Sequence, residues 1–190
     1  MRGTGRSLVI AISLAVVILA SEASTSYGQM PAPNFTLKDL NGFRFSLSDF
    51  RGRIVLLDFF ATWCRPCKEE VPHLKSLTKT YPNSTLVLIS ISVDAPFVDD
   101  SVVRAFVKEY GITWTVARDT DGVGYKYEVF EIPTLILVDQ EGDIRSRHVG
   151  LTDSETLQSR IEVIIPEFQT PAMITAFLLA AVAVLIRRKR

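Results

Sequence analysis

The sequence is poor in the residues that bind metals and build disulfide frameworks, with only two cysteines and two histidines among 190 residues. A structural zinc site usually takes four such ligands, whereas His73 and His148 fall on separate predicted elements. Covalent haem attachment needs a histidine directly after the second cysteine, where Lys68 stands. A disulfide between Cys64 and Cys67 would close a loop too small to stabilise a fold by much. We therefore expect no metal, no cofactor and no purely structural disulfide.

The sequence also lacks a net charge and any basic stripe. Its 21 basic and 21 acidic residues give a formal charge of zero. Six basic residues stand at the two ends, so 15 of the 21 remain in the middle, against 19 acidic ones once Glu22 and Glu167 are set aside. Nucleic-acid binding requires clustered Lys and Arg, so the mildly acidic middle excludes it. There is no internal repeat and no low-complexity tract.

The two cysteines lie where a predicted strand meets a predicted helix. Residues 54–60 form an apolar run of branched and aromatic residues, interrupted by Asp58, which is typical of a strand buried on both faces. After the sequence Trp63-Cys64-Arg65-Pro66-Cys67, helical spacing predicts an apolar face at Val71, Leu74, Leu77 and Thr78. The expected solvent-facing residues of this helix are Lys68, Glu69, Glu70, Lys75 and Lys79.

This position predicts redox chemistry for the pair. Free backbone N–H groups and the helix dipole stabilise a thiolate, so Cys64 is expected to be an exposed nucleophile with a lowered pKa. Cys67, one turn into the helix, would close the disulfide and expel a partner from a mixed disulfide. Asp58 would carry the proton of Cys67; the alternative is a carboxylate satisfied by buried water that affects stability alone. Arg65 and Pro66 are expected to tune the redox potential.

The segment resembles a thioredoxin-fold active site, specifically that of the exported TlpA/ResA-like branch of thiol-disulfide oxidoreductases. Four further features match: Pro72, the loop Ile132-Pro133-Thr134, Gly150, and residues 33–37 with the stretch from Gly42 to Gly52. The resemblance covers about residues 31–165. It implies an α/β thioredoxin-like fold with a mixed central sheet, helices on both faces and an N-terminal β-hairpin extension.

The resemblance also implies a substrate-binding groove. The loop at Pro133 would hold a cis proline facing the disulfide, with Ile132 beside it, and Gly150 would line the groove. Trp63, a large aromatic just before the nucleophile, would form an apolar platform for a substrate chain; its alternative is a core position.

The remaining elements follow from turn signals and periodicity. We expect a hairpin from residues 35–37 and 43–47, and two antiparallel strands at 133–138 and 144–149. A final helix should begin with a capping box of Thr152 and Glu155 and stop at Pro166. The other expected elements are strands at 86–93 and 114–117 and helices at 101–110 and 122–127.

Two other functions remain alternatives. Peroxiredoxin-type thiol peroxidases have a similar N-terminal half, but Ala61 and Leu57 stand where their threonine and proline would precede the nucleophile. The chain could also be a thioredoxin-fold binding module without redox turnover. For an oxidoreductase, the resemblance favours the reducing direction. Electrons would come from a membrane thiol carrier, and the clients would be exported proteins with thiols or disulfides, possible examples being apocytochrome c and envelope proteins.

The two ends predict export and anchoring. Arg2 and Arg6, an apolar run at 8–20 and Ser21-Glu22-Ala23 match a signal peptide of residues 1–23, the alternative being an uncleaved anchor. A linker at 24–33 and a domain at 34–165 would follow. Residues 166–190 combine Pro166-Glu167-Phe168, an apolar run at 172–186 and four basic residues. They resemble the PEF-CTERM sorting signal of archaeal surface proteins, which an archaeosortase recognises; the alternative is a plain transmembrane tail anchor. We expect an extracytoplasmic protein anchored to the cell membrane or envelope.

Overall fold

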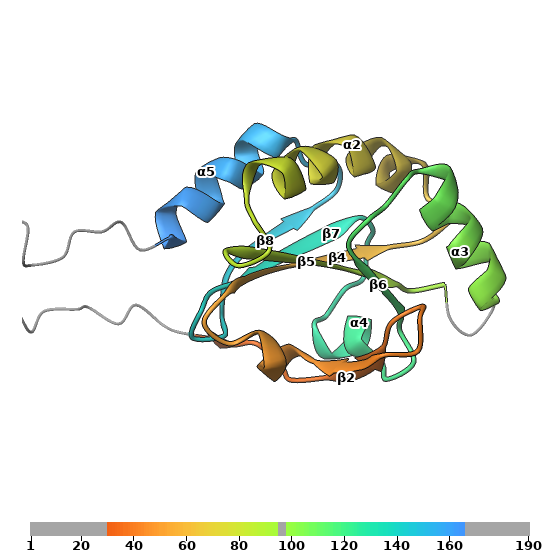
Figure 1. Ribbon diagram of the computed structural model, residues 1–190, viewed down its shortest axis with the longest axis horizontal. Helices are drawn as coiled ribbons and strands as arrows, with labels where there is room; N and C mark the ends of the chain where they lie inside the picture. Colours follow the sequence, from red (N-terminus) through yellow and green to blue (C-terminus); the bar gives the residue numbers. More distant parts are fainter. Residues whose placement is uncertain (1–29, 95–97, 166–190) are drawn as a thin grey trace, which may run out of the picture.

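The computed structural model describes residues 30–94 and 98–165, which form a mixed sheet covered on both faces (Figure 1). Six strands lie in the order β1-β8-β7-β4-β5-β6. The pairs β4–β5 and β5–β6 are parallel, and β4–β7, β7–β8 and β8–β1 are antiparallel. The strands are β1 (Met30–Pro31), β4 (Ile54–Phe60), β5 (Leu86–Ser92), β6 (Thr115–Arg118), β7 (Thr134–Val138) and β8 (Asp143–Val149). The predicted thioredoxin-like α/β fold is confirmed.

The central strands are buried on both faces, as their apolar runs predicted. Every residue of β4 and of β5 is buried. Because successive side chains of a strand point to opposite faces, Val55, Leu57 and Phe59 enter one core while Ile54 and Leu56 enter the other. Asp58 falls on the same face as Ile54 and Leu56, which places its carboxyl beneath the helix that follows the cysteines.

Three helices cover that face: α2 (Arg65–Thr80), α3 (Asp100–Glu109) and α5 (Ser154–Ile164). The opposite face is covered by α4 (Val123–Lys126) and by the predicted hairpin of β2 (Thr36–Lys38) and β3 (Arg44–Ser46), which a short 3-10 helix (Leu47–Phe50) follows (Figure 1). The α2 helix continues through Pro72 without interruption.

Aromatic side chains join the hairpin to the sheet. Phe35 packs edge-on against Phe45 and against Tyr127, with ring centroids 6.3 and 6.2 Å apart. Tyr127 is fully buried, contacts Phe59 of β4 and donates its hydroxyl hydrogen to the Pro33 carbonyl at 2.8 Å. The N-terminal extension is therefore part of the hydrophobic core.

Two local expectations differ from the structure. Met30 and Pro31, within the expected linker, pair with β8, so the packed chain begins earlier than residue 34. The last helix is capped by Asp153, whose carboxylate accepts the Thr156 N–H at 2.7 Å, and not by Thr152. Thr152 lies one residue before the cap, where its hydroxyl donates to the Gly150 carbonyl at 3.0 Å. Its N–H donates to Glu70 of α2, a contact that the sequence pattern did not reveal.

The predicted signal peptide, most of the predicted linker and the C-terminal segment 166–190 lie outside the described residues. Within residues 30–94 and 98–165, no helix is long and apolar enough to cross a membrane.

Candidate active site

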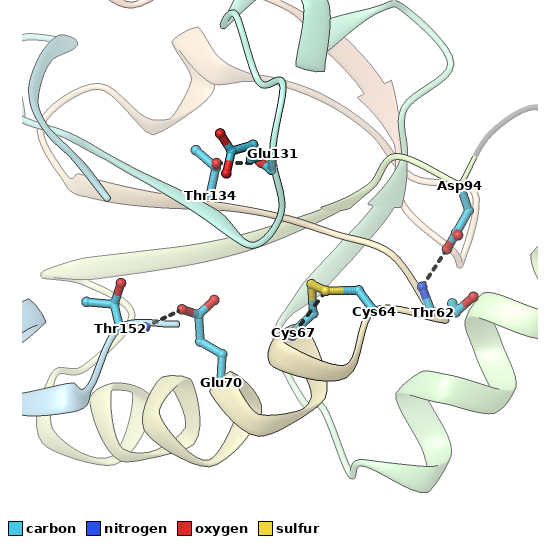
Figure 2. The surroundings of a disulfide bond; sticks show 8 residues. All are labelled: Thr62, Cys64, Cys67, Glu70, Asp94, Glu131, Thr134 and Thr152. Carbon is cyan, nitrogen blue, oxygen red and sulfur yellow. Dashed lines mark hydrogen bonds between the residues drawn. A yellow bond between two sulfur atoms is a disulfide. The ribbon is translucent and has the colours of Figure 1, made fainter. Parts of the chain in front are cut away.

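The cysteine pair lies at the start of α2, directly after the turn that ends β4 (Figure 2). Cys64 and Cys67 are joined by a disulfide, with their Cα atoms 5.3 Å apart. Cys64 is the N-cap residue of α2, and its Sγ accepts the backbone N–H of Cys67 at 3.2 Å. The site therefore brings a sulfur atom to the free donors and positive dipole end of a helix, as the sequence predicted.

No acidic residue occupies the first turn of α2, so no side chain there opposes a thiolate. Arg65 and Pro66 take the first two helical positions. The Arg65 side chain is exposed and donates to Glu69 Oε1 at 2.9 Å. Since an exposed ion pair contributes little energy, the redox-tuning role of Arg65 and Pro66 stays a prediction.

The expectation that Cys64 is exposed is wrong for the disulfide form, in which the residue is 4% exposed. It belongs to an apolar cluster with Phe60 and with Cys67, the buried residue to which its sulfur is bonded. The neighbouring Trp63 is instead 71% exposed, which excludes the core alternative for this aromatic. Its role as a platform for substrate stays a prediction.

Asp58 lies buried on β4, on the face covered by α2, and is 5% exposed. Ser90 on the adjacent strand donates its hydroxyl to Asp58 Oδ2 at 2.6 Å, and the Trp114 indole N–H donates to Ser90 at 2.8 Å. Burial raises the pKa of Asp58 from 3.8 to about 7, against a smaller lowering by the Ser90 hydrogen bond. The carboxyl can therefore take up or release a proton near neutral pH.

Glu70 is a second buried carboxyl, and its expected place on the solvent face of α2 is wrong. It is 1% exposed, and its Oε1 accepts the Thr152 N–H at 3.0 Å (Figure 2). Its Oε2 has no hydrogen-bond partner among the described residues. Burial, together with the charge of Asp58, raises the pKa of Glu70 to about 8. The sequence did carry a signal for the burial of Glu70: it lies three residues after Cys67, and residues at this spacing share a helix face.

The proline loop and the glycine that the resemblance singled out lie together. The Ile132–Pro133 peptide bond is cis, and the Gly150 N–H donates to the Pro133 carbonyl at 2.8 Å. Gly150 has a φ of 86°, a conformation that favours glycine. Ile132 packs against the apolar cluster that contains both cysteines. The structure brings Ile132, Pro133 and Gly150 together. The substrate-binding roles predicted for these residues and for Trp63 stay predictions.

A further contact at the site was missed by the sequence patterns. The backbone N–H of Thr62, two residues before Cys64, donates to Asp94 Oδ2 at 2.8 Å (Figure 2). Asp94 comes two residues after β5 ends, and no local motif predicts a contact across 32 residues. Within the described chain, no group of three His, Cys, Asp or Glu side chains is placed to hold a metal ion.

Known proteins with similar sequences and a similar fold include thiol-disulfide oxidoreductases. Residues 29–147 match the AhpC/TSA family. The thioredoxin-like protein YneN of Bacillus subtilis is 34% identical over 142 residues, which cover 75% of this chain and 82% of the relative. The thiol-disulfide oxidoreductase ResA of Bacillus subtilis is 33% identical over 168 residues, covering 86% and 92% of the two chains. A solved structure from Chlorobium tepidum, assigned as the thiol:disulfide interchange protein DsbE, is 30% identical with a TM-score of 0.66 and covers 73% of this chain and 97% of its own.

Proposed function

The chain belongs to the AhpC/TSA family and is a thioredoxin-like protein-disulfide oxidoreductase, and we propose that it works as a reductase of exported proteins outside the cytoplasmic membrane. The observation that carries the proposed exchange chemistry is the disulfide at the N-terminus of α2 with two protonatable carboxyls, Asp58 and Glu70, buried on the same side of the sheet. Relatives named as thiol-disulfide oxidoreductases support the same chemistry.

The reaction transfers two electrons to a client disulfide. In the reduced protein, the Cys64 thiolate attacks one client sulfur, and the other client sulfur leaves as a thiolate. The Cys67 thiol then loses its proton and attacks Cys64 Sγ, which releases the second client thiolate. The two client sulfurs end as thiols, and the Cys64–Cys67 disulfide is restored. A membrane thiol carrier would return the two electrons.

Asp58 is the proposed acceptor of the Cys67 proton. General bases work best when their pKa lies near the working pH, and burial raises the pKa of Asp58 to about 7. Glu70, three residues after Cys67 on the buried side of α2, is the second carboxyl that can exchange protons there. Substrate backbone would pair with the loop before Pro133, next to Gly150 and Trp63.

The proposed direction and clients rest on the family resemblance and on the chain ends. Apocytochrome c and envelope proteins are the client classes it suggests. The signal-like N-terminus and the segment 166–190 support export and attachment to the membrane or envelope, through a PEF-CTERM-type signal or a tail anchor. Mass spectrometry of protein isolated from cells tests the sorting hypothesis: a mass that includes Arg190 would exclude cleavage by an archaeosortase.

Trapping with Cys67→Ser tests the function most directly. Without Cys67, the mixed disulfide on Cys64 cannot be resolved, so clients should accumulate on the full-length protein expressed in its own cells. Non-reducing gels and peptide mass spectrometry would identify them. Cys64→Ser is the matched control and should trap far fewer proteins. Equal trapping by both variants would refute the assignment of Cys64 as nucleophile.

A redox titration separates the enzyme from the binding-module alternative. A disulfide that is merely structural typically has a potential below about −300 mV and resists reduction by glutathione. We expect a less negative potential and measurable reduction of insulin by the dithiol form. A structural potential combined with no insulin reduction would favour the module.

A further inference from the structure

Asp94 is a buried carboxylate that the exchange reaction described above does not use. It is 4% exposed and follows β5. Its Oδ2 accepts two hydrogen bonds, from the Thr62 N–H at 2.8 Å and from the Ser92 hydroxyl at 3.0 Å. Its Oδ1 is buried and has no hydrogen-bond partner among the described residues. Burying a carboxyl with one oxygen unpaired is unfavourable, so the burial of Asp94 calls for an explanation.

The turn that Asp94 contacts leads directly into the nucleophile Cys64. Residues 61–63 connect the end of β4 to Cys64, and the Cys64 N–H donates to the Ala61 carbonyl at 3.1 Å. The largest side chain of the turn, Trp63, is exposed, so the turn receives little packing from it. A neighbouring bond from the Val93 N–H to the Phe60 carbonyl, at 2.9 Å, holds the strand before the turn but not the turn itself. Asp94 supplies the side-chain contact at its middle.

We propose that Asp94 is a positioning residue, which fixes the Thr62 amide so that Cys64 Sγ stays against the first turn of α2. The proposal rests on the proposed thiol-disulfide exchange. Cys64 Sγ is 3.2 Å from the Cys67 backbone nitrogen, and this contact stabilises a thiolate only while the sulfur remains there. The carboxylate acts through hydrogen-bond acceptance from Thr62, so an amide oxygen at the same place should serve equally well.

Removing the hydrogen bond from Thr62 to Asp94 should change the pKa of the Cys64 thiol as well as the stability of the fold. If Sγ moves away from the helix start, the thiolate loses its donor and dipole, and the pKa of Cys64 rises. A rise of one pKa unit above the ambient pH leaves about one tenth of the thiolate. The same loss disfavours the reduced protein, which shifts its equilibrium with glutathione toward the disulfide.

The test compares Asp94→Ala, Asp94→Asn and Asp119→Ala in the full-length protein. Asp119 is the matched control, because its carboxylate accepts the Val123 and Gly124 N–H groups at 2.7 and 2.8 Å in α4 and plays no proposed part in exchange. For each variant, the pH dependence of Cys64 alkylation gives the thiol pKa, equilibration with glutathione gives the redox equilibrium, and thermal melting gives the stability.

We expect Asp94→Ala to raise the thiol pKa and slow alkylation at neutral pH about tenfold, with Asp94→Asn close to wild type. Asp119→Ala should lower the melting temperature and leave the thiol pKa unchanged. Two results overturn the proposal: an unchanged thiol pKa in Asp94→Ala, or the same change in Asp94→Asn as in Asp94→Ala.

Amide hydrogen exchange keeps the proposal testable if Asp94→Ala does not fold. In the oxidised wild-type protein, the Thr62 N–H should be strongly protected although it lies in a turn, and rapid exchange would overturn the positioning role. Failure of the proposed function would look different. It would appear in the wild type itself, as a Cys64 thiol that alkylates slowly at neutral pH and exchanges with no disulfide.

Discussion

Asp58, with its pKa raised from 3.8 to about 7, is a residue whose chemistry depends strongly on its surroundings. An exposed aspartate would be fully ionised at neutral pH and too weak a base to take a thiol proton. Burial between strands and under α2 changes that, while the Ser90 hydroxyl keeps the carboxyl from being protonated at still higher pH. The rates of the two exchange steps distinguish this proton-transfer role from the alternative, in which Asp58 affects stability alone.

Asp58→Asn should slow release of the client from the mixed disulfide by at least about tenfold at pH 7, because the proton acceptor for Cys67 is lost. The first attack by Cys64 should change little. The same variant should be more stable than wild type at pH 8 and above, since it removes a buried charge. Stopped-flow measurement of both steps checks this, and an unslowed second step would leave Asp58 with the stability role.

The β2–β3 hairpin is part of the N-terminal extension and packs against the central sheet. Its inward face contributes Leu37 and Phe45 to the core, beside Phe35, and the outward face remains polar. Because Phe35 touches both Phe45 of the hairpin and Tyr127 after α4, it joins elements that are distant in sequence. The hairpin lies on the opposite face of the sheet from α2, so it should affect stability more than exchange.

Phe35→Ala should destabilise the oxidised protein by about 3–5 kcal/mol, the usual effect of truncating a buried phenylalanine. Phe43→Ala, on the exposed tip of the same hairpin, is the matched control and should change stability by less than about 0.5 kcal/mol. Urea denaturation measures both. Similar small effects would mean that the hairpin is not packed as described.

Two buried carboxyls on the α2 side of the sheet make the stability of the whole molecule depend on pH. Asp58 and Glu70 bind protons more tightly in the folded protein, where their pKa values are about 7 and 8, than when unfolded, where 3.8 and 4.5 apply. Their contribution to stability is therefore complete below about pH 4 and is lost as the pH rises through 7 and 8.

The melting temperature of the oxidised protein should accordingly fall between pH 5 and pH 9. Glu70→Gln should reduce the fall, and Glu70→Gln combined with Asp58→Asn should nearly remove it, because glutamine and asparagine keep the hydrogen-bond acceptors without a charge. Calorimetry at a series of pH values checks this. An equally steep fall in the double variant would assign the pH dependence to other groups.

Periodicity and turn chemistry, which are local, determined most of the elements from the sequence. The buried run at 54–60, the cysteine pair before an amphipathic helix and the antiparallel strands around Gly142 all appear in the structure. The strand and helix patterns placed the cysteine pair where the helix begins, and the family resemblance predicted the cis bond before Pro133. The export and anchoring signals stay predictions, since they lie outside the described residues.

Only the tertiary structure decided which charged groups are buried. Glu70 directly follows Lys68 and Glu69 and was therefore expected on the solvent face of α2, yet the turn before α5 covers it and supplies the Thr152 N–H. Asp94 and Thr62 meet because β4 and β5 are parallel neighbours that end together. Burial and pKa depend on what packs against a side chain from distant parts of the chain, and a local sequence pattern carries no such information.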